Sequence, residues 1–129
     1  MDVNVKARLG KELYYTEVTA GNNTLITDEP TSLGGGDKGF NPFEILATSL
    51  ASCTAATLKM YMDRKQWVVD EIVVDVEVIR ETERTVFNRK VSFVGGNLTE
   101  DENKRLKIIA DKCPVHKALM GDVVVNTEF

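Results

Sequence analysis

Alternating polar and apolar positions dominate the first thirty residues and predict β-structure. Three short strands are expected at residues 3–9, 12–19 and 23–29. The pairs Gly10-Lys11 and Gly21-Asn22 separate them and suit tight turns. The glycine-rich stretch PTSLGGGDKGF follows at residues 30–40, and it lacks the spacing of a Walker phosphate loop. We therefore expect three strands and then a flexible loop.

The pattern changes to a helical period after the glycine-rich loop. Asn41 suits the N-cap, Pro42 the first helical position, and Glu44 the third position of a capping box. The helix is expected to run to about Lys65. No charged residue stands between Glu44 and Lys59, and apolar side chains form two rows rather than one. Those rows are Leu46, Leu50, Cys53, Thr57 and Met60 or Tyr61, and Phe43, Ala47, Ala51, Leu58 and Met62.

A helix that is apolar on most sides must be covered on most sides. A domain of this size has little material to do so, and the pattern therefore predicts a homodimer in which two such helices pack together. The rest of the chain predicts strands at 68–81 and 85–95, an amphipathic helix at 99–113, a short helical turn after Pro114 and a last strand at 122–129. This order predicts an α+β fold with antiparallel sheets, in a single domain over 1–129.

Composition narrows the classes of function. The net charge is −4 at neutral pH, which argues against a nucleic-acid-binding face. The N-terminus has no apolar stretch typical of a signal peptide, and the charge-free run 45–58 is too short to cross a bilayer. We therefore expect a cytoplasmic protein with no membrane partner. In that reducing compartment, its cysteines would normally be thiols.

The chain has two cysteines, Cys53 and Cys113, and one histidine, His116. The cysteines alone are compatible with a disulfide, part of a metal site, a redox pair or two small core residues. If the segment after Pro114 is helical, its free N–H groups could stabilise a thiolate on Cys113. A zinc site would need all three residues to converge, and a Cys113–His116 nucleophile would need a third orienting group.

Two motifs resemble the OsmC/Ohr family. The first is GGGDKGFNPFEILATSLASCTAATLKMY, at residues 34–61, and the second is DKCPVHKAL, at 111–119, followed by VVVNTE. The resemblance extends along nearly the whole chain and is nearest to the general OsmC-like branch. It implies an OsmC-like fold with a long central helix, an intertwined homodimer and active sites at the dimer interface.

The resemblance also implies a function in oxidative-stress defence. Cys53 matches the family's peroxidatic cysteine, which attacks an organic hydroperoxide and becomes a sulfenic acid. Cys113 matches the resolving cysteine, which forms a Cys53–Cys113 disulfide that an external dithiol reduces. No metal or other cofactor is implied.

The chain differs from the family's peroxidases in the residues that activate the thiol. Their activating arginine lies in the N-terminal hairpin, whereas residues 17–29, EVTAGNNTLITDE, contain no arginine. Their glutamate stands ten residues before the cysteine, whereas Glu44 stands nine before Cys53, about 180° around the helix. Glu44 is a candidate supporting residue, but the capping box explains it better. The alternative function is a non-catalytic dimer that binds a small hydrophobic ligand or senses oxidants.

Overall fold

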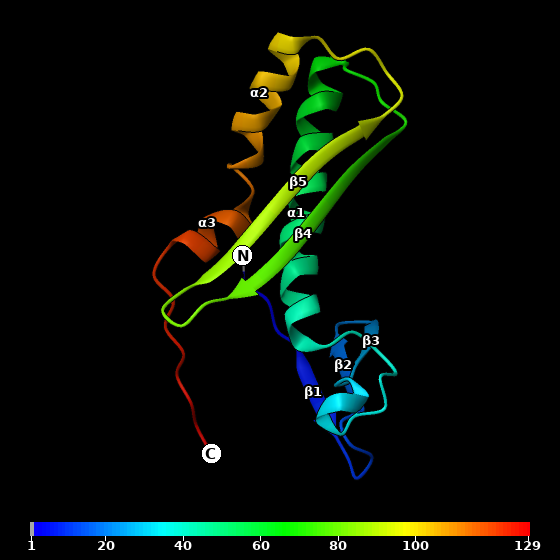
Figure 1. The fold of residues 1–129 in the computed structure, drawn as a ribbon, viewed down its shortest axis with the longest axis vertical. Helices are drawn as coiled ribbons and strands as arrows, with labels where there is room; N and C mark the ends of the chain where they lie inside the picture. The colour runs from blue at the N-terminus through cyan, green and yellow to red at the C-terminus, as the bar shows by residue number, and fades with distance from the viewer. Residues whose placement is uncertain (1) are drawn as a thin grey trace. The chain divides into compact units, whose positions relative to one another are not determined.

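The computed structural model describes residues 2–129 and has an α+β architecture with antiparallel sheets (Figure 1). Its contacts divide the chain into two compact units, the first ending at Leu46 and the second running from Ala47 to Phe129. The single domain predicted over 1–129 stays a prediction. Each unit is described separately below.

The first unit contains a three-stranded sheet. Strands β1 (Lys6–Leu9), β2 (Thr16–Ala20) and β3 (Asn23–Thr27) pair in that order, all antiparallel, and a 3-10 turn, Thr31–Leu33, follows. The three predicted strands are confirmed, although each is shorter than expected. The second begins four residues late, because Tyr15 N–H bonds to the Glu12 carbonyl in a turn instead of joining the sheet.

One buried carboxylate organises the loops of this unit. Asp28 is 1% exposed, and its side chain accepts hydrogen bonds from four backbone N–H groups. Burial acts to raise the pKa of Asp28, but the N–H groups outweigh it and hold the pKa below its ordinary value. The donors are Tyr14, Glu29, Gly36 and Lys38, at 2.8–3.4 Å. This carboxylate therefore joins the start of β2 to the glycine-rich loop.

Substituting Asp28→Asn should lower the thermal unfolding midpoint near neutral pH by roughly 5 °C or more, because an amide NH₂ would face a backbone N–H. A depressed folded-state pKa stabilises the fold above the ordinary carboxyl pKa, and this stabilisation is lost as pH falls through the folded value. The difference between the two proteins should therefore shrink as the pH falls below the ordinary carboxyl pKa of 3.8. Thermal melts at neutral and at acid pH, with Glu17→Gln on β2 as control, check this; equal midpoints at neutral pH would contradict it.

The long helix α1, Pro42–Lys65, begins in the first unit and continues through the second. Its predicted bounds are confirmed, and so is its capping box: Asn41 N–H donates to Glu44 Oε1 at 2.8 Å, and Glu44 N–H donates to Asn41 Oδ1 at 2.9 Å. Charged residues return only at the last turns, where Lys59 pairs with Asp63. The helix therefore starts and ends as its sequence predicts.

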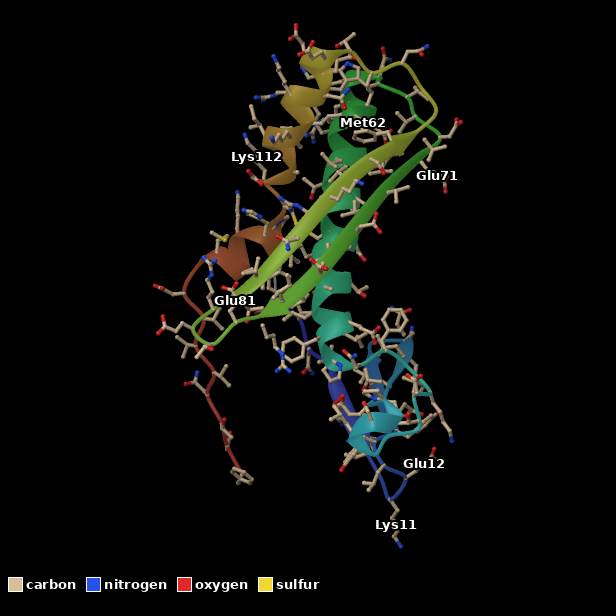
Figure 2. The ribbon with its side chains drawn as sticks, in the orientation of Figure 1. Lys11, Glu12, Met62, Glu71, Glu81 and Lys112 are labelled. Carbon is tan, nitrogen blue, oxygen red and sulfur yellow. The ribbon has the colours of Figure 1, made fainter. Side chains whose placement is uncertain are left out.

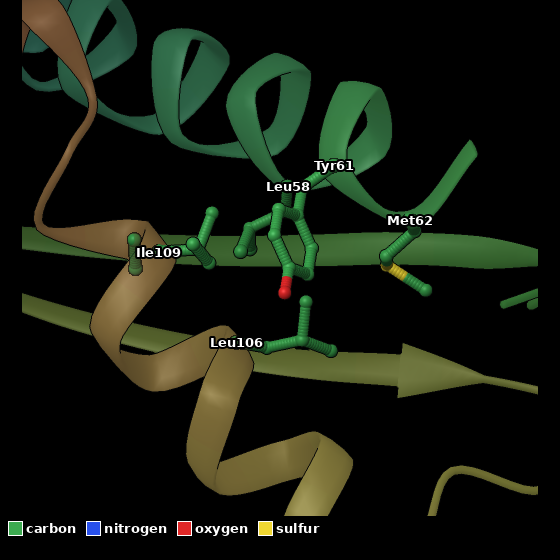
Figure 3. Close-up of a cluster of buried hydrophobic side chains, with 6 residues drawn as sticks. Leu58, Tyr61, Met62, Leu106 and Ile109 are labelled. Carbon is green, nitrogen blue, oxygen red and sulfur yellow. The ribbon is translucent and has the colours of Figure 1, made fainter. Parts of the chain in front are cut away.

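The second unit packs a hairpin and a second helix against α1. Strands β4 (Glu71–Arg80) and β5 (Thr85–Val94) form the hairpin, and α2 (Glu100–Ala110) begins with a Thr99–Glu102 capping box and ends three residues before the predicted end at 113. Side chains of α1 and α2 meet in the core, as Figure 3 shows. The core residues are Leu58, Tyr61, Met62, Leu106, Ile109 and Ala110. A short helix, α3 (Pro114–Met120), follows and confirms the predicted helical turn.

The prediction for the end of the chain needs correction. Residues 122–129 were predicted as a strand, but within the described chain they form none, and Val123, Val124 and Val125 are 72–83% exposed. A strand needs a neighbouring edge for its hydrogen bonds, and no other part of residues 2–129 provides it. The covering of α1 by a second copy stays a prediction: within the described chain only one face of α1 is buried, while Phe43, Leu46 and Met60 are exposed.

Candidate thiol site

The two cysteines meet in the second unit. Cys53 lies in the middle of α1, and Cys113 lies between α2 and α3 as the N-cap of α3. Their side chains interact with each other, and both are free thiols. The end of α2 therefore lies against the middle of α1. Packing of Leu106 and Ile109 against α1 brings this end of α2 to Cys53.

The two sulfurs differ in access. Cys113 is 0% exposed, whereas Cys53 is partly exposed. The backbone N–H groups of Val115 and His116, in the first turn of α3, act to lower the pKa of Cys113, although its side chain makes no capping hydrogen bond. Pro114 occupies the first helical position, where its missing N–H is not needed by the helix. The helical turn after Pro114 is therefore confirmed, whereas a thiolate stabilised by its N–H groups stays a prediction.

The environment favours negative charge on Cys113 rather than on Cys53. Burial raises the pKa of Cys53, and the hydrogen bond with Cys113 raises it further. Burial also acts to raise the pKa of Cys113, but hydrogen bonds from the Cys53 thiol, the His116 N–H, Thr54 and the Val115 N–H lower it overall. When the pair loses one proton, the negative charge is thus favoured on Cys113 and the remaining proton on Cys53.

An arginine that was not predicted from the sequence lies beside this pair of cysteines. Arg89 of β5 donates from Nη1 to Thr54 Oγ1 at 3.0 Å and to the Ala110 carbonyl at 3.3 Å, and from Nη2 to Asp111 Oδ1 at 2.8 Å. Its side chain is 14% exposed. The sequence signal that was available is the alternation along β5. Arg89 lies on the same inward face as the half-buried Val91 and Phe93, at every second position of the strand.

The other candidate residues are placed as follows. Glu44 lies in the first turn of α1, where its carboxylate accepts the Asn41 N–H. His116 lies in the first turn of α3, and its Nε2 is 3.9 Å from Asp111 Oδ1. Lys112, labelled in Figure 2, is exposed. No cluster of three metal-binding side chains occurs among residues 2–129.

A groove of about 460 Å³ lies next to this network, between β5 and α2. Leu58, Phe93 and Leu106 line its apolar part, and Arg89 and Asp111 line its polar part. The unit therefore has a partly apolar depression beside the arginine that contacts Thr54. None of the helices within residues 2–129 is long and apolar enough to cross a membrane.

Solved structures with the same fold come from several bacteria. The OsmC-like protein of Mycoplasma pneumoniae is 22% identical with a TM-score of 0.79, covering 94% of this chain and 89% of its own. An organic hydroperoxide resistance protein of Legionella pneumophila is 21% identical with a TM-score of 0.67, covering 94% and 90%. The organic hydroperoxide resistance protein OhrB of Bacillus subtilis is 23% identical with a TM-score of 0.61, covering 95% and 93%.

These likenesses establish the fold, and a family model establishes the relationship. Comparison with curated protein sequences finds no match. The model of the family described as OsmC-like protein matches residues 35–128, which include α1, the β4–β5 hairpin, α2, α3 and both cysteines. The chain therefore belongs to the OsmC-like protein family.

Proposed function

We propose that this protein is a cysteine-based peroxidase that reduces organic hydroperoxides in oxidative-stress defence. The observation that carries the proposal is the interaction between a partly exposed thiol, Cys53, and a fully buried one, Cys113. The access to Cys53 and the closeness of Cys113 support their assignment to attack and to resolution. Family membership supports a redox or peroxide-defence role.

In the first step we assign the attack to Cys53, because a hydroperoxide can approach this partly exposed residue. The environment of the pair, by contrast, favours negative charge on Cys113. The Cys53 proton passes along the hydrogen bond to the Cys113 sulfur. The Cys53 thiolate then attacks the terminal oxygen of the hydroperoxide ROOH and the O–O bond breaks. Cys53 becomes a sulfenic acid, and the alkoxide RO⁻ leaves and takes a proton from water to give the alcohol.

The second step uses the thiol that has just received the proton. The Cys113 sulfur attacks the sulfur of the Cys53 sulfenic acid, and hydroxide leaves with the thiol proton as water. The product is a Cys53–Cys113 disulfide. An external dithiol supplies two electrons and two protons to restore both thiols. No metal or organic cofactor takes part in these steps.

We also propose that the protein works as a cytoplasmic homodimer. The exposed apolar side chains Phe43, Leu46 and Met60 of α1 and the exposed valines 123–125 support a second copy as their cover. A strand partner from that copy would allow residues 122–129 to form the strand that their sequence predicts. Sedimentation analysis of the purified chain would test the dimer directly.

Steady-state turnover tests the proposed activity. The full chain with excess dithiol should consume cumene hydroperoxide well above the rate of dithiol alone, and Cys53→Ser should reduce consumption at least about 100-fold because it removes the nucleophile. Consumption equal to the dithiol blank in the wild-type protein would reject the peroxidase. The alternative would then be a non-catalytic dimer that binds a small hydrophobic ligand, which the raised pKa of Cys53 favours.

A further inference from the structure

Arg89 brings a charged side chain against Thr54 and Ala110, both of which lie next to the thiols. It reaches this position from β5, far from the cysteines in sequence. Its side chain is 14% exposed, and its guanidinium makes its three hydrogen bonds in a fork. A planar guanidinium with several N–H donors is suited to holding several acceptors in a fixed geometry.

The first contact acts on the backbone of Cys113. The Ala110 carbonyl accepts from Arg89 Nη1 at 3.3 Å and also from the Cys113 N–H at 3.3 Å. The same carbonyl thus links the guanidinium to the backbone that carries the buried sulfur. Asp111, the next residue, binds the other guanidinium nitrogen at 2.8 Å and fixes its orientation. The end of α2 is thereby held against β5.

The second contact acts on the side chain of Cys113. Thr54 is 0% exposed; its Oγ1 accepts from Arg89 Nη1 and donates to the Leu50 carbonyl at 2.7 Å, and its interaction with the Cys113 sulfur acts to lower the pKa of that thiol. A hydroxyl has one proton and can rotate it toward either acceptor. With its lone pair held by a cation, Thr54 is a better donor to a sulfur that carries negative charge.

From these contacts we propose that Arg89 is a positioning residue of the thiol pair. Through Ala110 on the backbone side and Thr54 on the side-chain side, it holds the Cys113 sulfur against Cys53. The inference rests on the proposed redox role of the two thiols, but not on the identity of the oxidant. Arg89 of β5 would then act on the thiols through Thr54 and Ala110 and would not touch the peroxide.

Disulfide closure driven by diamide measures this role without a hydroperoxide. Diamide takes up two electrons and two protons to become a hydrazide, while the two thiols become a disulfide. In the full chain, Arg89→Ala should close the Cys53–Cys113 disulfide about tenfold more slowly than wild type, because Cys113 is no longer held in place. Arg89→Lys should not restore the rate, since one ammonium cannot reproduce the fork.

Two further variants separate positioning from loss of folding. Arg84→Ala removes an arginine of the same hairpin that is 74% exposed, and it should leave the closure rate unchanged. Thr54→Val removes only the hydroxyl between Arg89 and Cys113, so it should slow closure severalfold even if Arg89→Ala fails to fold. The equilibrium redox potential of the pair, measured against a dithiol buffer, should shift in Arg89→Lys and Thr54→Val and not in Arg84→Ala.

An experiment with a hydroperoxide completes the test. After one equivalent of cumene hydroperoxide, folded Arg89 variants should accumulate a Cys53 sulfenic acid that dimedone traps, whereas wild type proceeds to the disulfide. If wild type is inert to hydroperoxide but diamide closure still requires Arg89, the peroxidase proposal fails and the positioning role stands. If Arg89→Lys and Thr54→Val both close the disulfide at the wild-type rate and potential, the positioning role is overturned.

Discussion

Replacing Cys113 with serine is expected to turn a recyclable protein into one that inactivates itself. Cys53 stays partly exposed and still reacts with hydroperoxide, but serine cannot form a disulfide with the sulfenic acid. The sulfenic acid then persists long enough for a second hydroperoxide to convert it to sulfinic acid, which a dithiol does not reduce. Turnover should therefore decay within a few cycles, while wild type continues.

Mass analysis of the Cys113→Ser protein during turnover checks this prediction. We expect dimedone to label Cys53 early, and two added oxygen atoms to appear on Cys53 as activity is lost. Wild-type protein treated in the same way should show the disulfide and little overoxidation. Sustained turnover by the variant without overoxidation would show that Cys113 does not resolve the sulfenic acid, and its burial beside Cys53 would then need another explanation.

The second large effect is expected from the core that carries Cys113. Leu106 is 2% exposed and packs against α1 through Leu58 and Tyr61 (Figure 3). Leu106→Ala should lower the free energy of unfolding by about 2–5 kcal/mol, because it leaves a cavity between α1 and α2. The same loosening at α2 should slow closure of the disulfide, since Cys113 directly follows the end of that helix.

A matched substitution on the same helix provides the control. Ile108 is 53% exposed, and Ile108→Ala should change the free energy of unfolding by less than about 1 kcal/mol. Denaturant titrations of both variants, read by circular dichroism, give the comparison. Equal losses of stability in the two variants would contradict the packing of Leu106 between the helices.

The starts of the helices were predictable because local chemistry determines them. Asn41 with Glu44 and Thr99 with Glu102 form reciprocal hydrogen bonds within four residues, and Pro114 fixes the start of the last helix. Such signals need no knowledge of the rest of the fold. The hairpin was predictable for the same reason, from alternation that continues on both sides of a short turn.

The features that depend on distant partners were predicted less well. The last eight residues read as a strand because of their valines, but a strand exists only where an edge is available to pair with it. Arg89 was not among the predicted site residues, because only its contacts with Thr54 and Ala110 give it a role. Thr54 lay outside both predicted rows of α1 although it is fully buried.

The central claim is that Cys53 and Cys113 form a working redox pair for hydroperoxides. Intact mass of the reduced full chain, after one equivalent of cumene hydroperoxide and then excess dithiol, tests it most directly. The account predicts rapid loss of two hydrogen atoms, reversal by the dithiol, and no such change in Cys53→Ser. Thiols that remain unchanged over an hour would contradict it and favour ligand binding as the role of this fold.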